Sequence, residues 1–141
     1  MVATSIEGRI LEALIAHLNV MPGGRKIVWS NIQYPKRGEY KDDEYILVAY
    51  SPGTPETITI TATEQNRHTG IFSLAVMCPL DVGELYPQEM GGTIAAHFQA
   101  KVLTSGSTRV RITARPRVAG GYVDGDRWRT PVTVPFETIS V

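Results

Sequence analysis

The chain has 141 residues, of which 43% are hydrophobic and 20% are charged, and this is the composition of one ordinary globular domain, expected over residues 1–141. Its 14 Lys and Arg residues balance 14 Asp and Glu residues, which excludes the strongly basic footprint of a dedicated nucleic-acid-binding protein. The apolar runs are too short to span a bilayer, no signal-peptide pattern is recognised, and one cysteine cannot form an internal disulfide, so we expect a protein made in the cytoplasm with no membrane contact.

The first predicted element is an amphipathic helix that begins after Thr4 and ends before Pro22. Thr4 and Glu7 have the spacing of a capping box, in which each side chain accepts from a backbone amide of the first turn. The apolar residues recur at steps of three and four and form one stripe, which consists of Ile6, Ile10, Leu11, Leu14, Ile15 and Leu18. This stripe requires a partner, most simply a sheet.

The next part of the chain is predicted to be mostly strand. Residues 27–29 and 45–50 are short runs of β-branched, apolar and aromatic residues, separated by a polar and charged loop over residues 34–44. Residues 57–63 alternate threonine with apolar residues, and residues 71–77 are almost continuously apolar. Because only a short polar stretch separates the last two strands, we expect them to pair as a hairpin.

A second helix is predicted between about Glu84 and Val102. Pro87 is tolerated only in a first turn, which places the start near residue 85 or 86. Gly91 and Gly92 interrupt the helical pattern, and a close approach of the helix backbone to a neighbour would explain them.

The last third of the chain returns to strand. A first alternating strand is centred on Val110 and Ile112, residues 116–129 are expected to be a long loop or irregular hairpin, and residues 132–136 form a final strand. Pro135 cannot donate to a ladder, so we expect an edge strand or a bulge there. The element order predicts an α+β fold with a mostly antiparallel or mixed sheet and two helices packed on one face.

A search for catalytic spacings finds no catalytic, cofactor-binding or metal site. No phosphate-binding glycine loop, nucleophile elbow or paired-histidine helix is present, and His17, His68 and His97 fall on two helices and one turn. Cys78 ends an apolar strand and is expected to be a buried thiol. The acidic run at residues 42–44 lacks the spacing of a calcium loop, so we interpret it as solvated.

Basic residues gather in the C-terminal third of the chain. Residues 101–129 contain seven Lys or Arg residues against two Asp, although the whole chain is neutral. Strand alternation predicts that Arg109, Arg111 and Arg115 share one face, opposite Val110 and its apolar neighbours. Such a face is suited to contact phosphates without reading sequence, to pair with acidic residues of another subunit, or to keep one side of the sheet hydrated.

Four strings, in this order and spacing, resemble the tail terminator proteins of long-tailed bacteriophages over nearly the whole chain. They are the helix SIEGRILEALIAHL, the strand and turn IVWSNIQYP, the glycine-led strand TGIFSLAVMCPLDVG and the closing segment DGDRWRTPVTVPF. The resemblance implies helices packed on a sheet, no catalytic residues and no cofactor. It also implies a virion tail protein that forms a hexameric ring, caps the tail tube, ends tail polymerisation and takes part in head–tail joining.

The partners implied by the resemblance are other copies of the chain, the tail tube protein, the head-completion or connector protein, and the DNA that passes through the lumen. We expect the loops at 34–44 and 116–129 to make assembly contacts, because edge pairing supplies backbone hydrogen bonds and loop charges choose the partner. The candidate residues in them are Lys36, Arg37, Asp42, Asp43, Arg117 and Arg127. The arginine face is then a candidate for the subunit interface or the lumen.

Other functions remain open at this level. A head-completion or connector protein of a phage or prophage would share the size and the ring symmetry. A small hydrolase or ligand-binding domain using Asp42, Asp43 and a histidine would need a concave pocket with converging polar groups.

Overall fold

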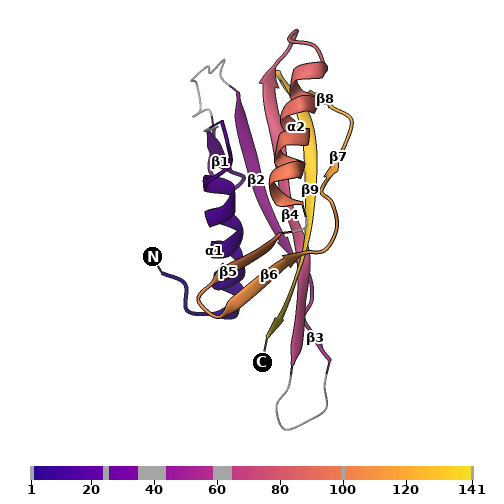
Figure 1. The fold of residues 1–141 in the computed structure, drawn as a ribbon. Coiled ribbons are helices and arrows are strands. Elements are labelled where there is room, and N and C mark those ends of the chain that lie inside the picture. Colours follow the sequence, from indigo (N-terminus) through magenta and orange to yellow (C-terminus); the bar gives the residue numbers. More distant parts are fainter. Residues whose placement is uncertain (1, 24–25, 35–43, 59–64, 100, 141) are drawn as a thin grey trace.

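The computed structural model describes residues 2–23, 26–34, 44–58, 65–99 and 101–140. Within them the chain forms two helices and nine strands, which confirms the predicted α+β class (Figure 1). In chain order these are α1 (Ile6–Asn19), β1 (Ile27–Trp29), β2 (Tyr45–Pro52), β3 (Glu56–Thr57), β4 (Asn66–Pro79), α2 (Leu85–Phe98), β5 (Val102–Ser105), β6 (Thr108–Ile112), β7 (Arg117–Val118), β8 (Tyr122–Asp124) and β9 (Arg127–Ser140).

The strands form one mixed sheet in the order β1-β2-β4-β9-β6-β5. Only β1 and β2 run parallel among the described pairs, and β3 adds to β4 while β7 and β8 add to β9. The antiparallel pair β4–β9 is continuous from Asn66↔Ser140 to Pro79↔Arg127 and forms the long axis of the molecule (Figure 1).

Both helices pack on one face of this sheet, as predicted. The core joins Leu14 and Leu18 of α1 and Ile94 and Phe98 of α2 to the inward side chains of the central strands, such as Phe72. The remaining buried hydrophobic strand residues of this core are Ile46, Val48, Leu74, Val76, Cys78, Leu103, Val110, Ile112, Val132, Val134 and Phe136. The opposite face has a much smaller cluster around Tyr45 and Met77.

The cap of α1 lies one residue beyond its predicted position. Ser5, not Thr4, is the N-cap, and its side chain accepts a hydrogen bond from the backbone N–H of Gly8 at 3.1 Å. One turn later, the Glu12 carboxylate accepts from the backbone N–H of Ala3 at 2.9 Å and from the Ser105 hydroxyl at 2.7 Å. These hydrogen bonds hold the pKa of Glu12 below its ordinary value and tie the N-terminal segment and β5 to α1.

The second helix begins at Leu85 as predicted but ends at Phe98, and Val102 starts β5 instead. A Cβ on Gly91 would lie 2.7 Å from Cγ1 of Val118, so this glycine permits the close contact between α2 and β7. Nothing lies within 4 Å of the corresponding position on Gly92. The predicted close approach is therefore confirmed for the first glycine and wrong for the second.

The two helices touch through a pair of histidines that the sequence analysis did not connect. The rings of His17 and His97 stack with centroids 3.9 Å apart and planes 8° apart. The Nε2 atom of each ring donates to the other residue's backbone carbonyl at 2.6 Å, and because a carbonyl only accepts, both rings carry a proton on Nε2. Burial lowers the pKa of His17, and the nearby charges of His97 and Lys101 lower it further.

The antiparallel pairing of the predicted hairpin is present where the structure describes it, between β3 and the start of β4, but the rest of β4 has other partners. Residues 70–77 pair with β2 on one side and β9 on the other, whereas β3 pairs only with Asn66 and Arg67. Residues 59–64 of the predicted 57–63 strand lie outside the described residues. His68 lies within β4 and not in a turn, and its ring hydrogen-bonds the Ser140 hydroxyl at 2.9 Å.

The predicted edge position of the final strand is wrong, since β9 lies between β4 and β6, and its register with β4 has no bulge. Pro135 accepts from the backbone N–H of Thr113 at 3.2 Å and Pro131 from that of Ala119 at 2.9 Å. In an antiparallel ladder the N–H and the C=O of one residue point to the same neighbouring strand. The carbonyls of Pro131 and Pro135 point away from β4, so the N–H groups that these two prolines lack would also have pointed away from β4. On that side the neighbouring chain is interrupted, between β6 and β7 opposite Pro135 and between β7 and β8 opposite Pro131.

The segment 116–129, predicted as a long loop or an irregular hairpin, forms the hairpin. It contains β7, β8 and the start of β9, and the turn between β8 and β9 uses Gly125 at φ 64°. A positive φ is readily adopted by glycine, which has no Cβ to clash with the backbone.

The two adjacent glycines of α2 provide a matched pair for a stability test. We expect Gly92→Ala to raise the free energy of unfolding by about 0.5–1 kcal/mol, because the added methyl meets open space and reduces the freedom of the unfolded chain. Gly91→Ala is expected to lower it by about 1–3 kcal/mol, because the stiff Val118 side chain must move. Urea unfolding of both variants measures the difference, and equal effects would contradict the packing described.

The histidine pair predicts a pH-dependent stability. The pKa of His17 is lower in the folded protein than the ordinary histidine value of about 6.5, so at acidic pH the unfolded chain binds more protons than the folded one. The contribution of His17 to the free energy of unfolding is therefore fully present above about pH 6.5. It is lost as the pH falls through the lower folded pKa. Thermal unfolding between pH 7.5 and 5 should show this loss. His17→Asn should weaken the pH dependence while the control His68→Asn keeps it; an unchanged profile in His17→Asn would contradict the assignment.

Candidate assembly surfaces

The three arginines expected to share a face do not all lie on one strand. Arg109 and Arg111 are on β6 with exposed side chains, alternating with the buried Val110 and Ile112. Arg115 lies beyond the end of β6, where the side-chain alternation no longer applies. The predicted alternation is therefore confirmed for Arg109 and Arg111, and Arg115 lies outside the strand on which the prediction rested.

These arginines have weak partners within the described part of the chain. Arg111 lies 3.4 Å from the Glu137 carboxylate of its cross-strand neighbour on β9, with the Arg111 side chain 61% exposed. Arg115 hydrogen-bonds the Gln99 side-chain oxygen. Solvent and salt screen such exposed contacts, so they contribute little to stability and leave the positive charge available to a partner.

The two segments expected to make assembly contacts differ in what the structure says of them. Lys36, Arg37, Asp42 and Asp43 lie outside the described residues. Arg117 is exposed on β7.

Arg127, by contrast, is only 5% exposed, and its guanidinium lies over the Tyr45 ring, 5.2 Å from the centroid. Its expected role as a loop contact is therefore replaced by a role inside the fold.

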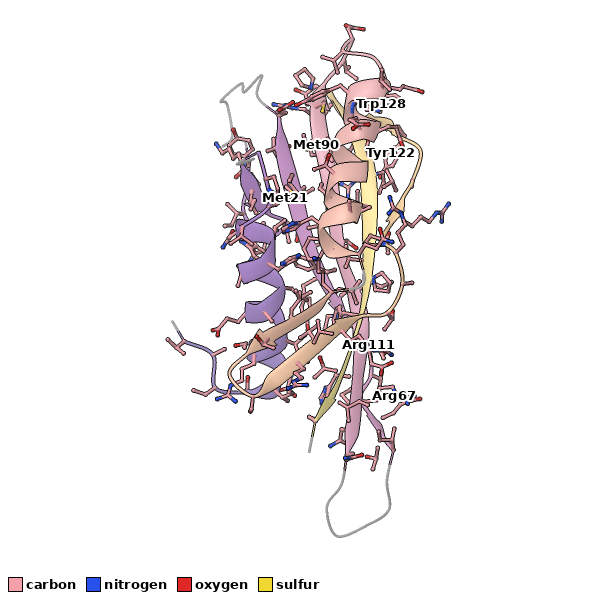
Figure 2. The ribbon with its side chains drawn as sticks, in the orientation of Figure 1. Met21, Arg67, Met90, Arg111, Tyr122 and Trp128 are labelled. Atoms are coloured by element: carbon pink, nitrogen blue, oxygen red, sulfur yellow. The ribbon has the colours of Figure 1, made fainter. Side chains whose placement is uncertain are left out.

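The sequence analysis missed an apolar groove at the end of the molecule where α2 begins. It has a volume of about 380 Å³ and is lined by the turn between β4 and α2 together with Val123 of β8 and Trp128 of β9. Figure 2 labels Trp128 at this end of the molecule. The lining residues of that turn are Pro79, Leu80, Asp81, Val82, Gly83 and Glu84.

The groove walls are unusually apolar for an exposed turn. Leu80, Val82 and Val123 are 39%, 48% and 59% exposed. The turn contains left-handed residues at Asp81 (φ 69°) and Gly83 (φ 80°), so its shape is specific. The sequence signal that could have indicated the groove is the presence of two large apolar residues, Leu80 and Val82, in a turn between a proline and a glycine.

Other kinds of site have no support in the described residues. Those residues contain no group of three or more His, Cys, Asp or Glu side chains that could hold a metal ion. None of the described helices is long and apolar enough to cross a membrane. Cys78 is completely buried, as expected. The exposed arginines of β6 and the apolar groove are surfaces that a partner could contact.

Comparison with known proteins identifies the family. A family model described as phage tail terminator protein matches residues 9–136. The chain belongs to the phage tail terminator family. This confirms the resemblance seen in the sequence and indicates a structural role in the phage tail, which favours a non-enzymatic protein.

The fold is shared with a solved structure of similar length. That structure superposes with a TM-score of 0.66 at 14% sequence identity, covering 94% of this chain and 92% of the other. At this identity the likeness concerns the fold alone. A search of curated proteins finds no sequence match.

The different burial of the arginines on β6 and of Arg127 predicts different effects on stability. We expect Arg109→Gln and Arg111→Gln together to change the free energy of unfolding by no more than about 0.5 kcal/mol, because both side chains are exposed. Arg127→Gln should lower it by about 2 kcal/mol, because a buried cation is removed from the Tyr45 ring. Urea unfolding tests both, and equal losses would contradict the distinction between surface and interior.

Proposed function

We propose that this protein is a tail terminator in the full sense: copies of the chain form a ring of six on the end of the completed tail tube. The ring ends tail polymerisation and presents a surface to the head-completion or connector protein. The observation that carries this proposal is the family match over residues 9–136, nearly the whole chain.

The sheet is compatible with a ring. Its order ends in two different strands, β1 on one side and β5 on the other. A ring needs head-to-tail contacts between unlike surfaces, which close when the rotation per subunit is right. Unlike edges supply unlike surfaces, and the neutral net charge keeps neighbouring copies from repelling one another at long range.

The proposed partners follow from this arrangement. They are further copies of the chain, the tail tube protein and the head-completion or connector protein, with DNA passing through the lumen without being read in sequence. An exposed arginine such as Arg117 suits the passage of a phosphate backbone because its contacts are electrostatic and independent of base. The chain would be made in the host cytoplasm and end in the virion tail.

The experiment that tests the function is removal of this chain from the phage or prophage that encodes it. Electron microscopy should show tails of excessive and variable length that do not join heads, and supplying the protein in trans should restore both length and infectivity. Tails of normal length without the protein would contradict the terminator function. Normal length combined with failure to join heads would instead favour a head-completion or connector role.

A further inference from the structure

The apolar groove beside α2 has the features of a docking surface. Its exposed side chains Leu80, Val82 and Val123 come from two separate segments and surround the partly buried ring of Trp128. Contiguous exposed apolar patches rimmed by polar groups mark sites of protein interaction. Nothing in the described part of the chain fills this cavity.

Carboxylates surround the groove. Asp81 and Glu84 line the cavity itself, and Asp124 and Asp126 lie in and beside the β8–β9 turn next to Val123. Asp124 is bound to Arg129 at 3.2 Å. Asp81, Glu84 and Asp126 form no ion pair within the described residues, and all three are exposed. The occupant should therefore have an apolar side chain flanked by cations.

The outer face of the β5–β6 hairpin has these features. Val102 is 58% exposed, and its cross-strand neighbour is Arg111. Thr104 faces Arg109 in the same way, and Lys101 precedes Val102 in the chain. Because cross-strand partners point to the same side of a sheet, an exposed valine lies among cations on this face.

We propose that the groove of one copy receives the β5–β6 hairpin of the next copy, with Val102 against the apolar floor and the hairpin cations against the rim carboxylates. This inference rests on the proposed ring and assigns its subunit contact. The apolar contact supplies affinity, and the opposed charges select the partner and orientation.

The two surfaces are arranged for a head-to-tail contact. Figure 2 shows Trp128 near the end of the molecule where α2 begins and Arg111 toward the other end. One copy can therefore offer its groove and its hairpin at the same time. Because the two surfaces are unlike, a row of bound copies always has a free groove at one end and a free hairpin at the other. Growth of the row ends only when these two ends bind each other and close a ring.

A charge-exchange experiment tests this contact. The groove variant is Glu84→Lys/Asp126→Lys, which leaves Asp81 and its left-handed backbone unchanged, and the hairpin variant is Arg109→Glu/Arg111→Glu. Each variant alone should self-associate at least tenfold more weakly than the wild-type chain in sedimentation velocity. A 1:1 mixture should recover association, because each reversed surface then meets the reversed surface of the other variant, and alternating rings contain even numbers of subunits.

Matched controls separate the contact from general effects of charge. Glu89→Lys on the exposed side of α2 makes the same kind of charge reversal outside both surfaces and should leave association unchanged. Val102→Ser removes the exposed apolar side chain without altering charge and should weaken association at least tenfold. Circular dichroism and thermal unfolding establish that each variant is folded.

Several outcomes would overturn the inference. Association of either variant at wild-type strength, or failure of the mixture to recover, would show that groove and hairpin do not bind each other. Association of the hairpin variant with loss in the groove variant would indicate a groove that binds another surface. A wild-type chain that never self-associates, alone or on tail tubes, would likewise exclude the contact, whereas the terminator function itself is judged separately by tail length.

Discussion

The structure depends on the hydrogen-bonded ladder between β4 and β9. The two strands pair without interruption from Asn66↔Ser140 to Pro79↔Arg127, and every layer of the fold is attached to this pair. β2 and β3 add to β4, while β6, β7 and β8 add to β9. Both helices pack on the face that includes Phe72, Leu74, Val132 and Val134. This pair makes more contacts than any other pair of strands, so its register determines how the strands on either side of it are placed.

The prolines of β9 explain how one side of this ladder became irregular. Pro131 and Pro135 lack donors on the side away from β4, and there the chain cannot continue as a single long strand. The result is three short strands in place of one, with breaks opposite the two prolines. Arg115 and Arg117 lie at the first of these breaks, so the same prolines that interrupt the ladder also place cations on the surface.

Local patterns predicted much of this fold. Helical periodicity located both helices, β-rich runs located β1 and β2, and the starting residue of α2 followed from the rule that Pro87 requires a first turn. The pairing of β4 with β9 was not predicted, because it joins residues 48 to 74 positions apart (127 − 79 and 140 − 66) and has no local signal. The edge prediction for β9 failed for a related reason: Pro135 indicates a missing donor but not the side on which the gap lies.

The surfaces were harder to predict than the fold. Alternation placed Arg109 and Arg111 correctly because their strand is regular, but it gives no placement for Arg115, which lies beyond the end of that strand. Arg127 looked like a loop cation, yet the ladder brings it over Tyr45 from a distant strand. The groove combines a turn after β4 with a hairpin before β9, and these segments meet only because Cys78 pairs with Trp128. Sequence spacing contains no measure of that proximity.

The ladder also bears on assembly. Both proposed contact surfaces are attached to β9: the groove lies beside Trp128, and β6 pairs with β9 at Phe136. These two positions on β9 are eight residues apart, which is about 27 Å at the usual rise of about 3.4 Å per residue. Ring closure requires a constant angle between the surface that a subunit offers and the surface that it accepts. Because β9 is bonded to β4 along its whole length, bending between the two surfaces would break ladder hydrogen bonds. A rigid β4–β9 pair therefore provides the fixed geometry that a closed ring needs, whereas surfaces on independent loops would allow open chains of subunits.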